Sequence, residues 1–458
     1  DPEKKKETEL GQINGYEISA DHKKMLVSSS GSYAIIDLPK SKIDMKDKLD
    51  LSNMEVNLDR KSEWKQIYHE AWRQMRDFFY APNMHGVDWV AMRDRYAPLV
   101  EHVHHRDDLT YIMGELMGEL NVGHAYVGGG ERPSAPRLSM GLLGAEMSRD
   151  ASGYFRIDKI LSGENWDNGS RSPLTELGVG VSEGDYILAI NGQPVDKMNN
   201  IYQGLINTAG KEIFLTVNSK PNSTGSREVL VKPLRDESGL YYYNWVRKNI
   251  EYVNKKTNGK VGYIHIPDMG VNGLNEFVKH YYPQLSKKAL IVDVRGNGGG
   301  NVSPMIIERL RREVAMIDIS RNVAPSLDPG GQIWGPMVCL VNEYSASDGD
   351  LFTYRFKKHK LGTVIGKRSW GGTVGIRGSL PLLDGGSLTK PEFSRYDEAG
   401  KEWIIEGYGV DPDIEVINDP ATEFKGVDQQ LDKAIEVITG QMKTDGKQIP
   451  PAPPYPVR

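Results

Sequence analysis

The sequence contains a single cysteine, Cys339, among its 458 residues. One thiol excludes an internal disulfide and any metal site built from several cysteines. No hydrophobic run approaches the length of a membrane span, and the first residues form no apolar signal core. We therefore expect no membrane contact. Cys339 lies in an apolar segment and is interpreted as a small core residue.

The chain has no large excess of positive or negative charge: its 57 basic and 62 acidic residues leave a net charge of -5. A chain without a broad basic field is not expected to bind nucleic acid. Three neighbouring histidines, His102, His104 and His105, have no acidic residue at ligand spacing. We interpret them as a solvated helix end and predict no metal.

A glycine-rich turn, 296–301, follows an apolar strand. A dinucleotide-binding loop would need glycine at its last position, where this chain has Asn301, and no phosphate-loop lysine follows. We therefore expect no cofactor. Consecutive glycines can instead bring backbone N–H groups close to a ligand, as an oxyanion hole requires. The alternative is a tight strand-to-helix turn without a ligand.

With 38% hydrophobic residues, the chain has material for three or four domains. Its strand and helix patterns define five parts. They are a β-propeller blade remnant at 1–57, a helical unit at 58–130, a PDZ-like β-domain at 136–234, an α/β domain at 241–440 and a proline-rich tail at 441–458. The expected fold class is multidomain α+β, with a mixed sheet in the α/β domain.

The alternation of short apolar runs and polar turn residues in 1–57 predicts three short strands, as in one blade of a β-propeller. A single blade cannot bury both of its faces. We therefore expect either that earlier blades precede it in a longer polypeptide or that it docks on the rest of the chain. The first residue is Asp1, which suits a processed product or a piece of a longer polypeptide.

A strand closed by an Asn-Gly turn, within 183–195, closely resembles a hairpin of PDZ domains. Such domains bind an extended peptide as an added strand beside their own edge. We expect segment 142–146 to supply that edge and segment 200–206 to form the flanking helix. The predicted peptide-binding residues are Leu142, Leu143 and Gly144. The alternative is a structural β-module with a covered groove.

A serine stands where an apolar strand gives way to a helix. The run 336–341 is followed by Ser345 and Ser347, and a helical stripe begins at Leu351. Unpaired N–H groups at a helix N-terminus can hold an oxyanion, so a hydrolase can present its nucleophile at such a junction. The alternative is that either serine simply caps the helix.

A serine nucleophile needs a base, and histidine suits the role because its pKa lies near neutrality. His124 lies in a glycine-containing loop after the helical unit, from which a side chain can project into a cleft. Glu406 stands between an apolar strand and a glycine turn, where it could orient a histidine. Each could also be an ordinary loop or strand-end residue.

Several passages together resemble the tricorn protease family. They are the glycine-rich turn after 293–295 and the segments 345–350, 366–373 and 406–413. The order of propeller blade, helical unit, PDZ-like module and α/β unit also matches, over essentially the whole chain. The resemblance implies the C-terminal part of such an enzyme, without its main propellers.

The resemblance also implies roles for individual residues. The implied catalytic residues are Ser347 as nucleophile, His124 as general base and Glu406 as the group that orients it. The implied oxyanion-hole donors are the N–H of Asp348 with that of Gly300 or Gly299. Asp318 occupies the place of an acid that selects basic side chains before the cut.

One position departs from the family pattern. The family has a serine before the histidine, which links it to the glutamate, and this chain has Gly123. Glu406 must therefore reach His124 directly, through water or through another hydroxyl. The related tail-specific proteases use a serine and a lysine, but a glycine stands at the lysine position within 370–373. That absence favours the Ser-His-Glu relay.

The motifs and the resemblance together predict a serine peptidase that cuts short or unfolded peptides through an acyl-enzyme, and the resemblance implies a preference for basic residues before the cut. The alternative is a non-catalytic scaffold that binds peptides through its PDZ-like module. The resemblance further implies a homo-oligomer with the substrate pocket shared between subunits. We expect a cytoplasmic protein, with an exported or periplasmic location as the alternative.

Overall fold

The computed structural model describes residues 7, 9–167, 169–378 and 380–457. The chain divides into two compact units, Asp1–Glu63 and Trp64–Arg458. Residues 1–6 and 8 of the predicted blade, and residue 458 of the predicted tail, lie outside the described residues. The boundaries proposed between the parts of the second unit remain predictions.

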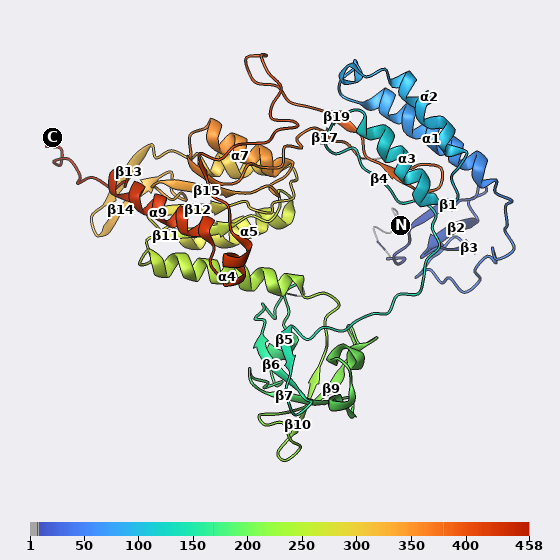
Figure 1. The fold of residues 1–458 in the computed structure, drawn as a ribbon, viewed down its shortest axis with the longest axis horizontal. Helices are drawn as coiled ribbons and strands as arrows, with labels where there is room; N and C mark the ends of the chain where they lie inside the picture. Colours follow the sequence, from blue (N-terminus) through green and yellow to red (C-terminus); the bar gives the residue numbers. More distant parts are fainter. Residues whose placement is uncertain (1–6, 8, 168, 379, 458) are drawn as a thin grey trace. The chain divides into compact units, whose positions relative to one another are not determined.

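The first unit contains a three-stranded antiparallel sheet in the order β1-β2-β3 (Figure 1). Its strands are β1 (Gly15–Ile18), β2 (Lys24–Ser29) and β3 (Ser32–Asp37). In these strands Met25, Val27 and Ala34 are buried, whereas Tyr16, Ile18, Tyr33 and Ile35 are exposed. The three predicted strands are confirmed, whereas their origin as a propeller blade remains a prediction.

The second unit begins within helix α1 (Arg60–Phe78), which is followed by α2 (Trp89–Val100) and α3 (Arg106–Gly118). A 3-10 turn, η1 (Met84–Gly86), lies between α1 and α2. The apolar positions that predicted these helices form one core, including Tyr68, Met75, Leu109, Met113 and Leu116. Helical spacing placed these side chains on one face of each helix, so their burial follows directly.

A distant segment of the chain completes this helical core. Leu382 and Leu388 are buried in it. Strand β4 (Val127–Gly128) pairs with β18 (Ser387–Leu388), and β17 (Gly375–Ile376) pairs with β19 (Pro391–Phe393). Arg106 of α3 forms a buried ion pair with Asp384. The loop that leaves the helices is therefore fixed against residues 382–389, which follow the fourth strand of the α/β sheet.

The PDZ-like part forms one sheet in the order β10-β9-β7-β6-β5. These strands are β5 (Ala145–Arg149), β6 (Phe155–Ile160), β7 (Tyr186–Ile190), β9 (Ile213–Asn218) and β10 (Arg227–Val231), with β8 (Gln193–Pro194) paired to β7. Asn191 and Gly192 both have positive φ, +48° and +73°, as the predicted hairpin turn requires. Segment 200–206 forms only a 3-10 helix, η4 (Ile201–Leu205).

Short 3-10 turns connect these strands at η2 (Pro173–Thr175) and η3 (Val195–Lys197). After β10, helix α4 (Ser238–Lys256) leads into the α/β part.

The α/β part is built on a sheet in the order β11-β12-β15-β16-β20. Its strands are β11 (Val261–His265), β12 (Ala289–Asp293), β15 (Met337–Val341), β16 (Gly362–Gly366) and β20 (Ile414–Glu415). Each pairing in this sheet is parallel, so the prediction of a mixed sheet is wrong. Crossovers that contain helices α5 (Val271–Tyr281), α6 (Ser303–Leu310) and α7 (Asp348–Lys358) join the first four strands, and a long segment with no helix among its described residues joins β16 to β20. Crossover connections of this kind return the chain to the same end of the sheet and produce parallel neighbours.

Helices cover both faces of the parallel sheet (Figure 1). The helices α5 (Val271–Tyr281), α6 (Ser303–Leu310) and α7 (Asp348–Lys358) pack on one face, and α4 and α9 (Gln429–Thr444) pack on the other. Alternate side chains of a strand point to opposite faces, so Val292 contacts the first layer and Ile291 the second. Cys339 is fully buried between β12 and β16, which confirms its assignment to the core.

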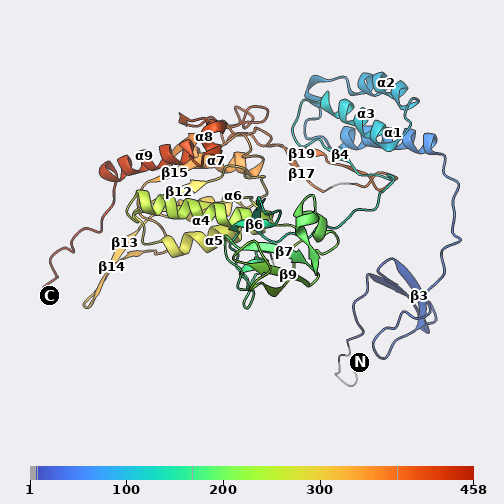
Figure 2. The same ribbon diagram turned by 60° about the horizontal axis from the view of Figure 1, so that its bottom comes forward.

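The remaining elements are η5 (Tyr282–Gln284), α8 (Pro420–Phe424) and a hairpin of β13 (Met316–Ser320) and β14 (Val323–Asp328). Figure 2 shows this hairpin projecting beyond the helices that cover the sheet. Among the helices of the described residues, none combines the length and the apolar character needed to cross a bilayer.

Candidate active site

Ser347 lies in the turn between β15 and α7, as the sequence predicts. Its backbone has φ +56° and ψ −116°, and in the described part of the chain its side chain makes no capping hydrogen bond. Positive φ is uncommon for a residue other than glycine and costs about 1–3 kcal/mol, so the surroundings must enforce it. Simple helix capping therefore does not explain this serine.

Ser345 has a different environment. It is fully buried, and its hydroxyl donates to the carbonyl oxygen of Val294 at 2.7 Å. This bond ties the end of β15 to the end of β12. Ser345 is therefore a structural residue of the turn, which leaves Ser347 as the candidate nucleophile.

The glycine-rich turn lies directly against Ser347. A Cβ atom at Gly299 would stand 2.5 Å from Ser347 Cβ and 3.1 Å from the nitrogen of Asp348. Gly299 also has φ +91°. Only glycine allows both this backbone conformation and this close approach. The Ala346 N–H donates to the carbonyl of Asn297 at 2.8 Å, which fixes the two loops together.

The structure distinguishes between the two predicted glycine donors. The Gly299 N–H donates to Oδ1 of Asn297 at 2.9 Å and is therefore already used. Within the described residues, the N–H groups of Gly300 and Asp348 have no acceptor. Gly300 and Asp348 are thus the better pair of candidate oxyanion donors.

The side chain of Asp348 anchors the nucleophile turn to helix α6. Its carboxylate accepts the N–H of Ser303 at 2.8 Å and the Ser303 hydroxyl at 2.7 Å. Ser303 is the first residue of α6, so the carboxylate lies at the positive end of that helix. This arrangement fixes the backbone of Asp348 while leaving its N–H unused.

His124 lies in the loop between α3 and β4, and its backbone has φ +62°. The hydroxyl of Thr389 donates to its carbonyl at 2.5 Å. The imidazole contacts the Trp370 ring edge-on, with 5.5 Å between centroids. Its Nδ1 atom is buried and has no hydrogen-bond partner in the part of the chain that the structure describes.

Burial lowers the pKa of His124, the charge of Glu406 raises it and the charge of Arg395 lowers it. The net direction is downward, because the half-buried imidazole loses the hydration that its charged form needs. The imidazole is therefore neutral at neutral pH. That is the protonation state from which a general base accepts a proton.

Glu406 connects the two parts of the site. Its Oε1 accepts the N–H of Gly123 at 2.8 Å. Its Oε2 accepts the N–H groups of Thr373 at 2.5 Å and Val374 at 2.8 Å, and the Thr373 hydroxyl at 3.2 Å. Among the described residues, Glu406 makes no hydrogen bond to the His124 ring itself. It acts on His124 through its charge and through the neighbouring backbone.

The turn that contains Ser347 and the ring of His124 both contact Trp370. The N–H of Trp370 donates to the carbonyl of Ser345 at 3.1 Å, and the Trp370 ring contacts His124. No hydrogen bond joins Ser347 to His124 in the described structure.

Asp318 lies on strand β13, where its side chain is exposed and opposite Ser326. The described residues supply no ion-pair partner for it. None of the contacts of Ser347, His124 or Glu406 involves this hairpin. Within one chain, the structure therefore does not bring Asp318 to the other candidate site residues.

The predicted peptide-binding residues are engaged within the PDZ-like part. Leu143 is buried, Leu142 exchanges two backbone hydrogen bonds of 2.8 Å with Leu234, and the Gly144 N–H donates to Glu237 at 3.1 Å. Strand β5, which begins at the next residue, is an edge of the sheet among the described strands. An added strand could therefore pair with β5, but the backbone of Leu142 and the Gly144 N–H are already occupied.

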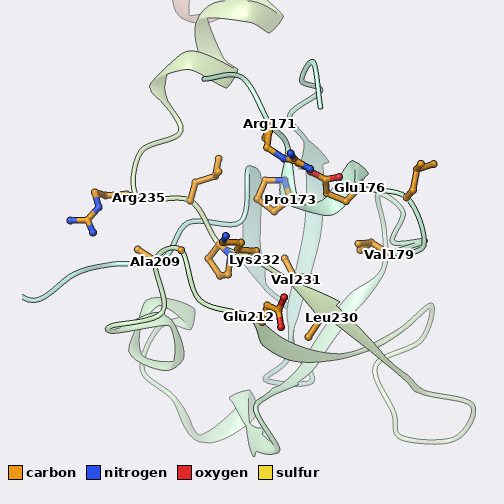
Figure 3. A pocket seen from close by; sticks show the side chains of 14 residues that line it. Arg171, Pro173, Glu176, Val179, Ala209, Glu212, Leu230, Val231, Lys232 and Arg235 are labelled. Atoms are coloured by element: carbon orange, nitrogen blue, oxygen red, sulfur yellow. Dashed lines mark hydrogen bonds and ion pairs between the residues drawn. The ribbon is translucent and has the colours of Figure 1, made fainter. Parts of the chain in front are cut away.

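A hollow of about 500 Å³ lies elsewhere in the PDZ-like part, beside β10 (Figure 3). Figure 3 shows Arg171 and Glu176 beside one another, and they form an ion pair of 2.6 Å. Leu230 and Lys232 line another side of this hollow. None of the candidate catalytic residues lines it, so it is not part of the catalytic site.

The described residues contain no group of three or more His, Cys, Asp or Glu side chains that could hold a metal ion. His102, His104 and His105 are exposed.

Sequence reasoning missed the residues that join the parts of the site. They are Trp370, Thr373 and Thr389, together with Asn297 and the buried acid Asp350. Most of them act through backbone groups of distant segments, and such contacts leave no local pattern. The Gly-Gly step at 371–372 was the only available signal of close packing there.

Three family profiles match the chain. The Tricorn protease C1 domain matches residues 60–118, the Tricorn protease PDZ domain matches residues 141–236, and peptidase family S41 matches residues 260–416. The last match contains Ser347 and Glu406, and His124 lies between the first two matches.

Individual relatives match nearly the whole chain. Tricorn protease homolog 1 of Streptomyces coelicolor is 36% identical over 97% of this chain and 42% of its own length. The tricorn protease of Thermoplasma volcanium is 34% identical over 96% of this chain and 42% of its own length. A crystal structure of the tricorn protease matches with a TM-score of 0.86 and 33% identity, over 97% of this chain and 43% of that one.

The chain thus spans about two fifths of the length of these relatives. With the strand-turn-helix geometry at Ser347, the matches to its helical, PDZ-like and α/β parts place the chain in the tricorn protease family.

Proposed function

We propose that the protein is a serine peptidase that hydrolyses peptides through an acyl-enzyme on Ser347. The observation that carries this proposal is the Ser347 turn. A strained serine without a capping bond lies against a glycine loop, and the N–H groups of Gly300 and Asp348 have no acceptor in the described structure. The family membership supports the same chemistry.

In the proposed reaction, His124 accepts the proton of the Ser347 hydroxyl as its oxygen attacks the peptide carbonyl carbon. The carbonyl oxygen becomes an oxyanion and accepts hydrogen bonds from Gly300 and Asp348. Collapse of the tetrahedral intermediate breaks the C–N bond, and His124 returns the proton to the leaving amine. Water then hydrolyses the ester by the same steps, and Ser347 recovers its proton.

Glu406 supports the charged imidazole that forms in these steps. Its carboxylate raises the pKa of His124 against the larger effect of burial. Proton transfer by such a base contributes about 10²–10⁴ in rate, and one oxyanion donor about 10²–10³. The Gly123 N–H takes the place of the family's serine in binding Glu406 to the histidine loop.

We propose that the carboxylate of Asp318 selects substrates that have a basic residue before the cut. The carboxylate is exposed on a projecting hairpin and has no ion-pair partner among the described residues. Since it does not meet Ser347 within one chain, we propose that it serves the active site of a neighbouring copy. A homo-oligomer is therefore part of this proposal.

Turnover of fluorogenic peptides by Ser347→Ala tests the reaction. We expect loss of essentially all activity and of covalent labelling by a fluorophosphonate. Ser286→Ala, which removes an exposed hydroxyl elsewhere, is the matched control and should keep both. Retained turnover in Ser347→Ala refutes the nucleophile. Peptide binding by the unaltered chain without any labelling would favour a non-catalytic scaffold instead.

A further inference from the structure

Asp350 is a buried acid that the proposed reaction does not use. It lies in the first turn of α7, three residues after Ser347, and its side chain is fully buried. Burial raises its pKa to about 6, although neighbouring hydroxyl and N–H groups lower it. Keeping a carboxylate in such a place costs stability, because its charged form loses hydration.

The carboxylate of Asp350 faces the loop 369–372. Its Oδ1 accepts the N–H of Gly371 at 2.8 Å. The hydroxyl of Ser369 and the N–H groups of Gly372 and Ser347 are near enough to lower its pKa. Its Oδ2 is buried and accepts no hydrogen bond from the described residues. One side chain thus adjoins both the nucleophile and this loop.

The same loop contacts the base and the acid that supports it. The ring of Trp370 contacts the His124 imidazole. The carbonyl of Gly371 accepts the N–H of Gly407 at 2.8 Å, next to Glu406. The Cα of Gly372 lies 3.1 Å from the position of a Cβ at Gly123. Any shift of the loop relative to α7 would therefore move His124 relative to Ser347.

We propose that Asp350 is a positioning residue for the hydrolysis, which holds loop 369–372 against the Ser347 turn and thereby sets the His124 imidazole relative to the Ser347 hydroxyl. This inference rests on the proposed function. The two catalytic side chains come from segments that are far apart in sequence and share no direct hydrogen bond, so their alignment depends on intermediate contacts. Misplacement of a catalytic group by about 1 Å can cost about 10²-fold in rate.

The test compares Asp350→Ala, Asp350→Asn and Thr353→Val in the full chain. Thr353 is the matched control, because it is fully buried in the same helix and its hydroxyl donates only to Gly349 of that helix, at 3.1 Å. Values of kcat and KM are measured with a fluorogenic peptide. Endpoint labelling with a fluorophosphonate gives the number of competent sites, so that kcat refers to folded enzyme.

We expect Asp350→Ala to lower kcat by roughly 10²-fold with KM changed less than about threefold. Asp350→Asn keeps one acceptor for Gly371 and should lose only about tenfold, a partial rescue. Thr353→Val should keep kcat within about twofold. A purely structural residue would reduce the labelled fraction and leave kcat per labelled site unchanged.

Unchanged kcat per site in Asp350→Ala, or a rise in KM alone, overturns the proposal. If Asp350→Ala does not fold, Asp350→Asn decides, and a wild-type kcat in that variant also overturns it. Ser347→Ala is measured in parallel. Turnover that survives in Ser347→Ala refutes the proposed function, whereas a silent Ser347→Ala beside a fully active Asp350→Ala refutes only the positioning role.

Discussion

The backbone N–H of Gly123 donates a hydrogen bond of 2.8 Å to Oε1 of Glu406, a residue 283 positions later in the chain. This bond joins the loop that carries His124 to the loop before β20, the last strand of the α/β sheet. A serine is expected here from the family pattern, and the chain keeps the connection to the glutamate with a main-chain donor. The contact explains how a glycine can occupy this position without separating the two loops.

Gly123→Ala should lower kcat by roughly tenfold. A Cβ here would lie 3.2 Å from Glu406 Oε1 and 3.1 Å from the Cα of Gly372, so one of these groups must move. Gly123→Ser adds the same Cβ together with a hydroxyl that can donate to Glu406. We expect the serine variant to exceed the alanine variant in kcat/KM. Equal activity in both variants would show that a hydroxyl at this position has no access to Glu406.

The pH dependence of kcat/KM should show an acid limb below the ordinary pKa of histidine. His124 must be neutral to accept a proton, so activity is present above its lowered pKa and is lost as the pH falls through it. Arg395→Gln removes a charge that lowers this pKa and should move the limb to higher pH. Glu406→Gln removes a charge that raises it and should move the limb to lower pH, in addition to slowing the reaction. Shifts in the same direction for both variants would contradict His124 as the titrating base.

Mixing two defective variants should restore cleavage after basic residues. Asp318→Ala keeps Ser347 but should lose its preference for Arg and Lys over Phe, and Ser347→Ala keeps Asp318 but is inactive. If Asp318 serves the site of a neighbouring copy, hetero-oligomers of the two contain a complete site. We expect the mixture, and neither variant alone, to regain the preference. Light scattering on the same samples measures whether oligomers form, and an unaltered preference in Asp318→Ala alone refutes its role.

Asp350→Asn should stabilise the fold at pH 7.5 by up to roughly 3 kcal/mol. Asp350 has a pKa raised from 3.8 to about 6 by burial, so the folded state binds its proton more tightly than the unfolded state. The free energy of unfolding of the unaltered protein therefore falls as the pH rises from about 4 to 6. Above pH 6 the ionised Asp350 lowers it by the full amount. The gain from the amide should vanish near pH 4. Urea denaturation at both pH values measures it.

The exposed Asp318→Asn is the matched control for this measurement and should show no difference between the two pH values. A gain of the same size at pH 4 and pH 7.5 would mean that the charge of Asp350 is not its source. A more stable but slower Asp350→Asn enzyme would identify Asp350 as a residue kept for alignment at the expense of stability.

Local patterns were sufficient for the elements that form the site. The apolar run before Ser347 predicted β15, the stripe from Leu351 predicted α7, and the Asn-Gly step predicted the hairpin after β7. Each pattern depends on residues a few positions apart, and side-chain spacing or turn conformation fixes the result. The residues alone offered Ser345 or Ser347 with His124 and Glu406, and the family resemblance implied Ser347 as nucleophile, with roles that remain proposals for the experiments above to test.

Contacts between distant segments could not be predicted in this way. The sheet is parallel rather than mixed, since strand direction follows from how the crossover segments pack and not from the strand sequences. Leu382 and Leu388 pack in the helical core although they lie more than 250 residues after its helices in the sequence. The N–H of Gly299, and not that of Gly300, donates to the side chain of Asn297. Only the folded chain assigns these partners.

The amino-acid sequence by itself therefore determined the elements, the order of the parts and the chemical types of the candidate residues, because these depend on short-range periodicity and side-chain identity. The tertiary structure alone decided that Glu406 meets Gly123 and that Asp350 lies between Ser347 and loop 369–372. Those contacts join backbone groups to side chains across long stretches of chain, and backbone groups are the same in every residue but proline.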